Sequence, residues 1–432
     1  MASIECGEDA AKHFAFAPGY RNLNHGSYGT YPIEVRDVLR AYQEEVEARP
    51  DAFVRYKYRT GLLDECRAAI AHYLEVPTDT CVFTPNTSTG IDTILHNLVY
   101  SEGDVVICFN TIYVSYAYTL DYLSKTTPMR VESINFTYPV SDDILCHLFE
   151  KTIVSIKNNG QTPKLAIFDT ISSLPGVRMP FQRLVKICRD HGVLSLLDGA
   201  HGVGQIQLDL TNVDPDFFLS NCHKWLYVPR GCAVFYVPKR NQSLSKVTLP
   251  TGYHYGDGFV ANFASVGTLD DTPYLCVPAA IAWRKRITWK GKQGDAAIMD
   301  YMANLAHDGG SAVARILETE VLENKEGTLG NTACTNVRLP LSLDDLAEND
   351  MATVHKIGDW IMRTINLEHD IALNIFPYVG ALWTRLHAQI YLTLADFEAA
   401  GMMLHVVCER AQKGEWKTAS ARATYDKSNG HT

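Results

Sequence analysis

The stretch between residues 164 and 199 contains KLAIFDT (Lys164–Thr170), PFQRLVKICRDHG (Pro180–Gly192) and VLSLLDG (Val193–Gly199), in that order. The two outer segments are short apolar runs, as expected of strands that are buried on both faces. The middle segment has the apolar spacing of a helix, with a proline near its start and a glycine at its end. A strand, a helix and a second strand in succession indicate parallel strands joined by a crossover helix, so we predict an α/β fold.

The same alternation extends in both directions from this stretch. DVVICFN (Asp104–Asn110) is another apolar run, and we expect one open sheet over residues 75–245. Beyond residue 280, helical segments alternate with strand-like segments such as TACTNVRLPL and ALWTRLHAQIYL, which favours a smaller α+β domain. We predict an N-terminal arm over residues 1–35, a large domain over residues 36–280 and a small domain over residues 281–432.

The composition limits the classes of function. The chain has 432 residues, 46% of them hydrophobic, and a formal net charge of −10. It has no run of lysine and arginine and no apolar stretch long enough to span a membrane, so we expect neither nucleic acid nor a membrane as a partner. The 11 cysteines are scattered without a CxxC pair, which favours reduced thiols over disulfides or a metal site. Because the sequence starts without a secretory signal, we expect a cytoplasmic protein.

Three polar signals follow predicted strands, at the edge where ligands bind in such sheets. The first is FTPNTSTG, in which a hydroxyl-rich turn opens a predicted helix. Thr87, Ser88 and Thr89 would offer hydroxyl and backbone N–H groups to a phosphate at the helix N-terminus. The alternative is an ordinary N-cap without a ligand.

The second signal is Asp198, which ends the apolar run VLSLLD. A carboxylate there needs a cationic partner or several donors, and the alternative is a capping aspartate. The third signal is Lys224, which stands beside His223 in SNCHKWLYV, where its neighbours are typical of a protein interior. Its alternative is a lysine whose amine extends to solvent.

One cofactor, pyridoxal phosphate, requires all three signals. Its aldehyde needs a lysine amine, its pyridine nitrogen needs a carboxylate, and its phosphate needs a polar helix start. The sequence offers the phosphate loop, Asp198 and Lys224 in an order that fits one open sheet. We predict pyridoxal phosphate as the cofactor and no metal ion.

The sequence resembles a known family, the fold-type I pyridoxal phosphate enzymes of the class V aminotransferase superfamily. That group includes cysteine desulfurases and isopenicillin N epimerase-like proteins. The motifs that carry the resemblance lie between residues 22 and 391: NLNHGSYG, NTSTGI, SLLDGAHGVG, DPDFFLSNCHKWLYVPRGCAVFYV, SVGTLDDTP and RLHAQIY. The resemblance implies a large domain with a mainly parallel seven-stranded sheet and a smaller α+β C-terminal domain.

The resemblance also implies roles around the cofactor. Lys224 would form the Schiff base and then move protons at the substrate Cα, and Asp198 would pair with the pyridine nitrogen. His201 would bond the ring oxygen, in the place of a glutamine that is more usual in the family. The phosphate would be held by the side chains of Thr87, Ser88, Ser220 and His223.

Further roles concern the substrate and a second subunit. The resemblance places Thr268 at the phosphate of the neighbouring subunit, which implies a homodimer with shared active sites. Arg385 would bind the substrate α-carboxylate through its two-pronged guanidinium, and the alternative is a structural ion pair. Asn24 and His25 would line the substrate side. Tyr113 would protonate a leaving group, or would only stack on the cofactor ring.

Within this family the chain is similar to the C–S lyases of ergothioneine formation, so the leading prediction is a lyase that acts on an amino-acid substrate. A carbon–carbon bond-forming cyclase of alkaloid biosynthesis and an amino-acid epimerase remain alternatives. Lys224, Asp198 and Arg385 together argue against a non-catalytic binding protein. Cys334 lies some fifty positions before Arg385, in a strand-like run, which argues against sulfur transfer through an enzyme persulfide.

Overall fold

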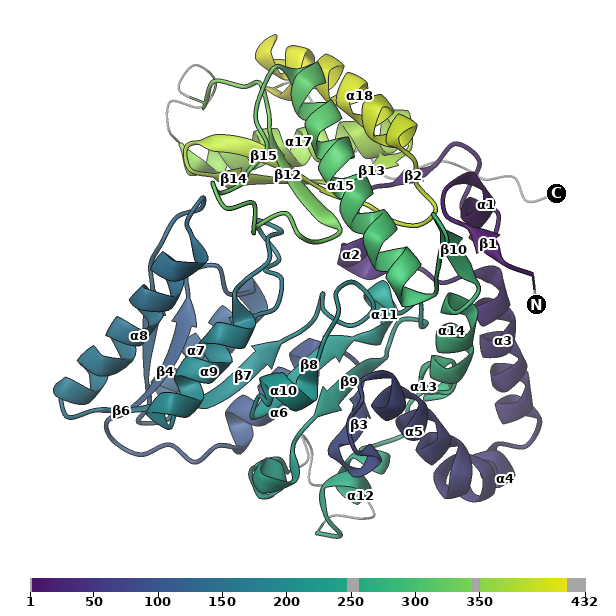
Figure 1. Cartoon of the computed structure of the whole chain (residues 1–432), viewed down its shortest axis with the longest axis vertical. Coiled ribbons are helices and arrows are strands. Elements are labelled where there is room, and N and C mark those ends of the chain that lie inside the picture. The colour runs from purple at the N-terminus through teal and green to yellow at the C-terminus, as the bar shows by residue number, and fades with distance from the viewer. Residues whose placement is uncertain (1, 247–255, 344–345, 347–349, 418–432) are drawn as a thin grey trace.

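A computed structural model of the chain describes residues 2–246, 256–343, 346 and 350–417 (Figure 1). Its larger part is organised around a seven-stranded sheet with the strand order β3-β9-β8-β7-β6-β4-β5. Every neighbouring pair is parallel except those of β9, which is antiparallel to β3 and β8. This confirms the predicted mainly parallel seven-stranded sheet. The strands are β3 (Cys81–Thr84), β4 (Asp104–Phe109), β5 (Arg130–Ile134), β6 (Thr162–Asp169), β7 (Leu194–Asp198), β8 (Phe217–Asn221) and β9 (Ala233–Tyr236).

The strands of this sheet are apolar because both of its faces are covered. In β6, Ile167 packs with one hydrophobic cluster and Phe168 with the other, and Leu219 and Phe218 do the same in β8. Successive side chains of a strand point to opposite faces, so a strand covered on both sides reads as a continuous apolar run. Helices α6 (Thr87–Asn97) and α7 (Val114–Thr126) cover one face, and α5 (Leu63–Tyr73), α8 (Asp142–Asn158) and α9 (Phe181–His191) cover the other.

A smaller α+β part follows, as predicted. Its sheet is antiparallel with the order β12-β15-β14, and three long helices pack around it (Figure 1). These elements are β12 (Cys334–Arg338), β14 (Asn374–Tyr378), β15 (Ala381–His387), α15 (Asp295–Leu317), α17 (Met351–His369) and α18 (Leu394–Gln412).

The N-terminal segment joins the two parts. Strand β1 (Ile4–Glu5) pairs with β10 (Ile287–Trp289), which also pairs with β11 (Lys292–Gln293), and β2 (Arg21–Asn22) pairs with β13 (Ile371–Ala372). Helix α2 (His25–Tyr28) then packs on α11 (Cys222–Trp225), the short helix directly after β8. The segment therefore shares sheets with the C-terminal part, while the boundaries 1–35, 36–280 and 281–432 stay predictions.

The remaining elements connect these layers. They are α1 (Glu8–Ala11), α3 (Ile33–Ala48), α4 (Pro50–Phe53), η1 (Val54–Leu62), η2 (Thr78–Thr80), α10 (Leu210–Val213), η3 (Lys239–Leu244), α12 (Phe259–Ala264), α13 (Thr272–Leu275), α14 (Val277–Arg284) and η4 (Glu415–Lys417). Among the described residues, no helix combines the length and the apolar character that crossing a membrane requires.

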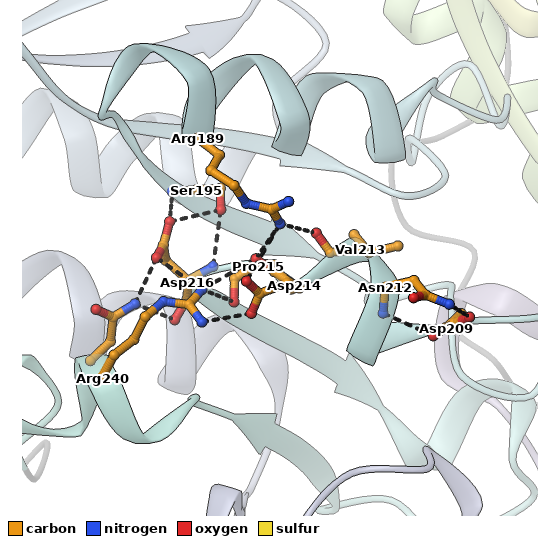
Figure 2. A network of polar contacts seen from close by, with 10 residues as sticks. Arg189, Ser195, Asp209, Asn212, Val213, Asp214, Pro215, Asp216 and Arg240 are labelled. Carbon is orange, nitrogen blue, oxygen red and sulfur yellow. Dashed lines mark hydrogen bonds and ion pairs between the residues drawn. The ribbon is translucent and has the colours of Figure 1, made fainter.

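Two ends of the central sheet carry polar side chains. At the amino ends of β7 and β8, Ser195, Asp216 and Arg240 belong to a network of hydrogen bonds and ion pairs that also reaches α9 (Figure 2). At the carboxyl ends, β6 finishes with Asp169 and β7 with Asp198. The second group opens on a cavity.

Candidate active site

A cavity lies beyond the carboxyl ends of β6, β7 and β8, where ligands bind in sheets of this type. The cavity brings together three features that lie far apart in the sequence: the hydroxyl-rich turn with Thr87 and Ser88, the carboxylate of Asp198 and the amine of Lys224. Its walls are formed by Ser27, Asn86, Thr87, Ser88, Tyr113, Tyr116, Asp169, Ser173, Asp198, Ala200, His201, Asn221, His223 and Lys224.

Lys224 presents its amine to this cavity from α11. Its neighbours Cys222 and Trp225 are fully buried, which explains the interior character of the surrounding sequence. Burial lowers the pKa of Lys224 to about 8, although the nearby Asp198 carboxylate favours the charged form. An amine with this pKa is partly deprotonated near neutral pH, and the free amine is the form that attacks a carbonyl carbon.

Asp198 and Asp169 end neighbouring parallel strands in matched register, and both line the cavity. Asp198 is 3% exposed, and its Oδ1 accepts a hydrogen bond of 2.8 Å from the backbone N–H of Ala200. Burial and the proximity of Asp198 raise the pKa of Asp169 well above its ordinary value, and burial also raises the pKa of Asp198. Two buried carboxyl groups side by side disfavour double ionisation, so the pair retains a proton.

The start of α6 forms another wall. The N-cap of the helix is Asn86, whose Oδ1 accepts a hydrogen bond of 2.8 Å from the backbone N–H of Thr89. The cap is therefore supplied by a residue before the predicted hydroxyl cluster. Thr87 and Ser88 line the cavity at the first turn of the helix, where backbone N–H groups and the helix dipole favour an anion.

His201 lies directly behind the lysine. Its Nε2 is 3.1 Å from Nζ of Lys224, and its Nδ1 accepts a hydrogen bond of 3.2 Å from the indole N–H of Trp225. Burial and the positive charge of Lys224 hold the pKa of His201 well below its ordinary value, so the ring is neutral. His223 lines the cavity too, and its Nδ1 is 2.9 Å from the carbonyl oxygen of Cys232.

His25 contacts the backbone of Lys224 and does not line the cavity. Its Nε2 is 2.6 Å from the carbonyl oxygen of Lys224, and its Nδ1 is 3.0 Å from the hydroxyl of Tyr391. Burial lowers the pKa of His25 to about 4. The sequence predicted a substrate-lining residue at this position, and the contacts describe a residue that holds the backbone of α11.

The two glycines of NHGSYG explain why α2 can pack so closely on α11. A Cβ on Gly26 would lie 2.8 Å from Cε1 of both His201 and His387. A Cβ on Gly29 would lie 1.7 Å from the carbonyl oxygen of His223, and Gly29 has a φ of 66°, in the left-handed region. The motif thus fixes the backbone of the N-terminal segment against the helix that carries the lysine.

Arg385 reaches the cavity wall from β15 of the smaller part. Its Nη1 donates to the carbonyl oxygen of Ser173 at 2.6 Å, and its Nη2 donates to Oδ1 of Asn24 at 3.1 Å and to Oγ of Ser27 at 3.0 Å. Its Nε is buried without a hydrogen-bond partner in the described part of the chain. A buried guanidinium held by neutral oxygens is suited to bind a carboxylate.

The three predicted site residues Tyr113, Ser220 and Thr268 differ in where they lie relative to the cavity. Tyr113 caps the start of α7 at the cavity, and its ring packs edge-on against Tyr116 with centroids 5.4 Å apart. Ser220 is fully buried behind the wall, where its hydroxyl donates to Gly199 and accepts from the backbone of Val203. Thr268 is exposed and lines a separate hollow of the same chain. Its predicted role at a neighbouring subunit therefore stays a prediction.

A profile of the family described as Aminotransferase class-V matches residues 30–350. The chain belongs to the class-V aminotransferase family. The match spans the central sheet, the lysine helix and the first strand of the smaller part. It confirms the family that the sequence motifs indicated.

Several relatives match nearly the whole length of this class-V enzyme. It is 35% identical to the L-cysteine desulfhydrase-like protein lolT1 of Epichloe uncinata, over 94% of this chain and 96% of the relative. It is 27% identical to the hercynylcysteine sulfoxide lyase of Schizosaccharomyces pombe, over 93% of this chain and 98% of the relative. A solved complex of the cystine C-S lyase C-DES with cysteine persulfide has a TM-score of 0.73 at 16% identity, covering 90% of this chain and 98% of that chain, which shows the same fold.

The cavity of this class-V enzyme fits pyridoxal phosphate, the cofactor of the family. Lys224 supplies the amine, Asp198 supplies a buried carboxylate, and the first turn of α6 supplies donors for a phosphate, all in one cavity. The prediction of this cofactor is confirmed. Within the described residues, no group of three histidine, cysteine, aspartate or glutamate side chains is arranged to hold a metal ion.

Sequence reasoning missed several residues of the site, among them Asn221, Tyr116 and Asp169. Asn221 accepts from the backbone N–H of Thr87 at 3.0 Å and donates to its hydroxyl at 3.1 Å, which ties β8 to α6. Tyr116 donates to the same hydroxyl at 3.2 Å. Asp169 had a usable signal, because it ends KLAIFD in the same way as Asp198 ends VLSLLD.

Cys334 lies close to the site but is a poor nucleophile. It begins β12, is 1% exposed, and its Sγ is 3.8 Å from Oε1 of Gln205. Burial raises the pKa of its thiol to about 11, so the thiolate is scarce at neutral pH. This supports the expectation that Cys334 does not carry sulfur as a persulfide.

Proposed function

We propose that this class-V enzyme is a C–S lyase, which breaks the bond between sulfur and the β carbon of an amino acid. With water, the products would be pyruvate, ammonia and a thiol, or a sulfenic acid in place of the thiol where the substrate is a sulfoxide. The observation that carries the proposal is Tyr113, a phenol at the cavity that holds Lys224. Its side chain is 40% exposed, and its hydroxyl forms no hydrogen bond within the described part of the chain. The names of lolT1 and of the hercynylcysteine sulfoxide lyase support the same chemistry.

Arg385 would bind the α-carboxylate of the substrate. Its unpartnered Nε and its two Nη groups lie behind Ser27 and Ser173, which themselves line the cavity. A carboxylate that replaces a neutral oxygen at this guanidinium gains a charge-assisted hydrogen bond. The amino group and the scissile bond of a small amino acid would then lie between Arg385 and Lys224.

Two side chains would move protons. Pyridoxal phosphate, when bound, supplies a carbonyl that captures the substrate amine and a ring that withdraws electrons from the bonds at Cα. Lys224, with its pKa lowered to about 8 by burial, is suited both to take a proton from Cα and to return it. Tyr113 would donate its hydroxyl proton to the departing sulfur, which gains negative charge as the bond breaks.

We also propose a homodimer in which Thr268 completes the site of the partner. Thr268 is exposed next to Leu269, which is 55% exposed, and both lie outside the cavity of their own chain. Val46 and Val54 line the same hollow, and contiguous apolar surface marks sites of protein–protein interaction. Light scattering that gives the mass of a single chain for the active enzyme would contradict this arrangement.

The lyase is tested with Tyr113→Phe, which keeps the ring and deletes the acid. The probes are cysteine, an S-alkyl cysteine and its sulfoxide, each assayed for pyruvate and for exchange of the Cα hydrogen in deuterated water. We expect pyruvate formation to fall by about a hundredfold or more, while exchange stays near the parent rate. The matched control is Tyr118→Phe, on the same helix and 70% exposed, which should change neither rate.

The same experiment distinguishes the alternatives. If no sulfur compound yields pyruvate and Tyr113→Phe leaves exchange and turnover unchanged, the acid role is wrong. A reaction without a leaving sulfur atom, such as the carbon–carbon bond-forming cyclisation, would then explain the site better. Exchange without any product would point to an epimerase.

A further inference from the structure

Trp225, the residue after the lysine, contacts the site through His201. Its indole N–H donates to Nδ1 of His201 at 3.2 Å, and Nε2 of the same ring is 3.1 Å from Nζ of Lys224. Trp225 and His201 are both buried, with exposed fractions of 0% and 4%. The three side chains therefore form one chain of contacts that ends at the reactive amine.

The direction of the first hydrogen bond fixes the second. An indole nitrogen is a donor only, so Nδ1 of His201 must be the acceptor and cannot carry a hydrogen. A neutral imidazole carries its single hydrogen on the other nitrogen, which is Nε2. That hydrogen faces Nζ of Lys224. An ammonium group has no lone pair to accept it, whereas a free amine does.

We propose that Trp225 is a positioning residue that fixes His201 with its hydrogen on Nε2, so that His201 donates to Lys224 and favours the free amine. No charge is needed for this effect, because the tautomer alone decides whether His201 offers a hydrogen or a lone pair. The opposite tautomer would accept from the ammonium and stabilise the unreactive form. A cofactor atom at the same place would likewise meet a donor.

The other histidines near the lysine are held in the same way and carry no charge. His25 must donate from Nε2 to the carbonyl oxygen of Lys224, which leaves its Nδ1 to accept from the hydroxyl of Tyr391. His387 accepts the backbone N–H of Gly26 on Nδ1 at 3.0 Å. Burial lowers the pKa of both rings, so neither adds a cation beside the amine.

Titratable groups face Lys224 from four strands. Asp198 of β7 and Asp169 of β6 favour the ammonium, whereas burial and the guanidinium of Arg385 on β15 favour the free amine. The thiol of Cys334 on β12 faces the lysine as well, and burial keeps it protonated. A change at Trp225 removes none of these groups, so a shift in the titration of Lys224 would report the tautomer of His201.

The test measures the titration of Lys224 in the full-length chain after the cofactor has been released with hydroxylamine, which takes the aldehyde from the lysine as an oxime, and removed by dialysis. Brief acetylation over a series of pH values, followed by mass spectrometry of the peptide that contains Lys224, gives the fraction of free amine. In Trp225→Phe, Nδ1 loses its donor and His201 is free to accept from the ammonium. We expect the inflection to move upward by about one pH unit, which slows acetylation at pH 7 by about tenfold.

Two further variants separate the hydrogen bond from packing. Replacement of Trp225 by β-(benzothien-3-yl)alanine keeps the two fused rings and substitutes sulfur for N–H, so it should shift the inflection as Trp225→Phe does. Trp416→Phe removes a buried indole whose nitrogen has no hydrogen-bond partner in the described part of the chain, and it should leave Lys224 unchanged.

A direct reading of the tautomer completes the test. Long-range proton–nitrogen spectra of the chain labelled in histidine identify which nitrogen carries hydrogen, and the signal of His201 is the one absent from His201→Gln. We expect hydrogen on Nε2 in the parent and its loss or redistribution in the benzothienyl variant. Hydrogen on Nδ1 in the parent, or an unchanged Lys224 inflection in both Trp225 variants, would overturn the proposal.

Discussion

Strands β7 and β8 carry a cluster of polar side chains at each end, one shown in Figure 2 and one in the cavity. At the amino ends, Asp216 accepts from the backbone N–H and hydroxyl of Ser195 at 2.9 and 3.1 Å and from Asn241 at 2.7 Å. Arg240 pairs with Asp216 at 3.3 Å and with Asp214 at 2.6 Å. The charged groups of this end are balanced, and several of them remain in contact with solvent.

At the carboxyl ends of β7, β8 and the neighbouring strand β6, the arrangement is the opposite. Asp198 and Asp169 are buried side by side, and the pKa of each is raised, first by burial. Burial lowers the pKa of Lys224 to about 8. The folded protein thus disfavours the charged forms of both the carboxyl groups and the amine at this end of the sheet. Polar groups at the amino ends of the strands therefore stabilise the fold, whereas those at the carboxyl ends are held ready for proton transfer.

The sharpest test of this contrast is Lys224→Ala. We expect turnover to fall by about ten thousandfold or more, equivalent to about 5 kcal/mol of barrier, because the amine that captures the cofactor and moves the proton is gone. We expect no loss in the free energy of unfolding of the cofactor-free chain, because burial disfavours the charged form of this lysine in the folded protein. Steady-state kinetics and urea denaturation measure the two quantities.

The control for this variant is Lys224→Arg, which keeps a positive charge near Asp198 but lacks a primary amine. It should be as inactive as Lys224→Ala. Appreciable turnover in the arginine variant would mean that the charge alone carries the function, and the two ends of the sheet would then differ less than the comparison states.

The sequence predicted the sheet, and it singled out the hydroxyl-rich turn at the start of α6, Asp198 and Lys224, which the fold brings to one cavity, because these depend on local signals. Buried parallel strands read as apolar runs, and a polar residue that follows such a run lies at the ligand-binding edge. Asp169 also follows an apolar run, but the pyridine nitrogen of the cofactor needs only one carboxylate. Asp198 met that need, so Asp169 was missed. Register between β6 and β7, which places the two carboxyls side by side, is a property of the folded sheet.

Other features needed the fold itself. The antiparallel direction of β9 is not encoded in its own apolar residues, because a buried strand reads the same in either direction. Ser220 and Asn221 are adjacent in sequence and face different environments, one behind the wall and one in the cavity. The contacts of His25 with α11 likewise join segments almost two hundred positions apart.

A smaller effect is expected from Asp169→Asn, measured as stability of the cofactor-free chain. Asparagine keeps the shape and removes one of two competing carboxyls, so the free energy of unfolding at pH 7 should rise. The pKa of Asp169 is higher in the folded chain than in the unfolded chain, where it lies near pH 4. Ionisation of Asp169 therefore does not destabilise the folded chain below about pH 4, and it destabilises the folded chain increasingly as the pH rises toward the folded pKa. The gain over the parent should therefore shrink as pH falls to 4.

Asp198→Asn is the matched comparison for that measurement. The carboxylate of Asp198 accepts the backbone N–H of Ala200, which favours its charged form, so its removal should stabilise the chain less. A stability gain for Asp169→Asn that does not change between pH 4 and pH 7 would show that the pair does not compete for a proton.

The smallest expected effect lies at the amino ends of the strands, in Arg240→Gln. The side chain of Arg240 is 45% exposed, so solvent screens its ion pairs with Asp214 and Asp216. We expect the free energy of unfolding to fall by about 0.5–1 kcal/mol at low salt and by less at high salt, with turnover unchanged. Lys186→Gln, which removes one exposed pair on α9 outside this network, should cost less still. If Arg240→Gln lowered turnover as well, the amino ends would be coupled to the cavity through β7 and β8, and the division between the two ends of the sheet would not hold.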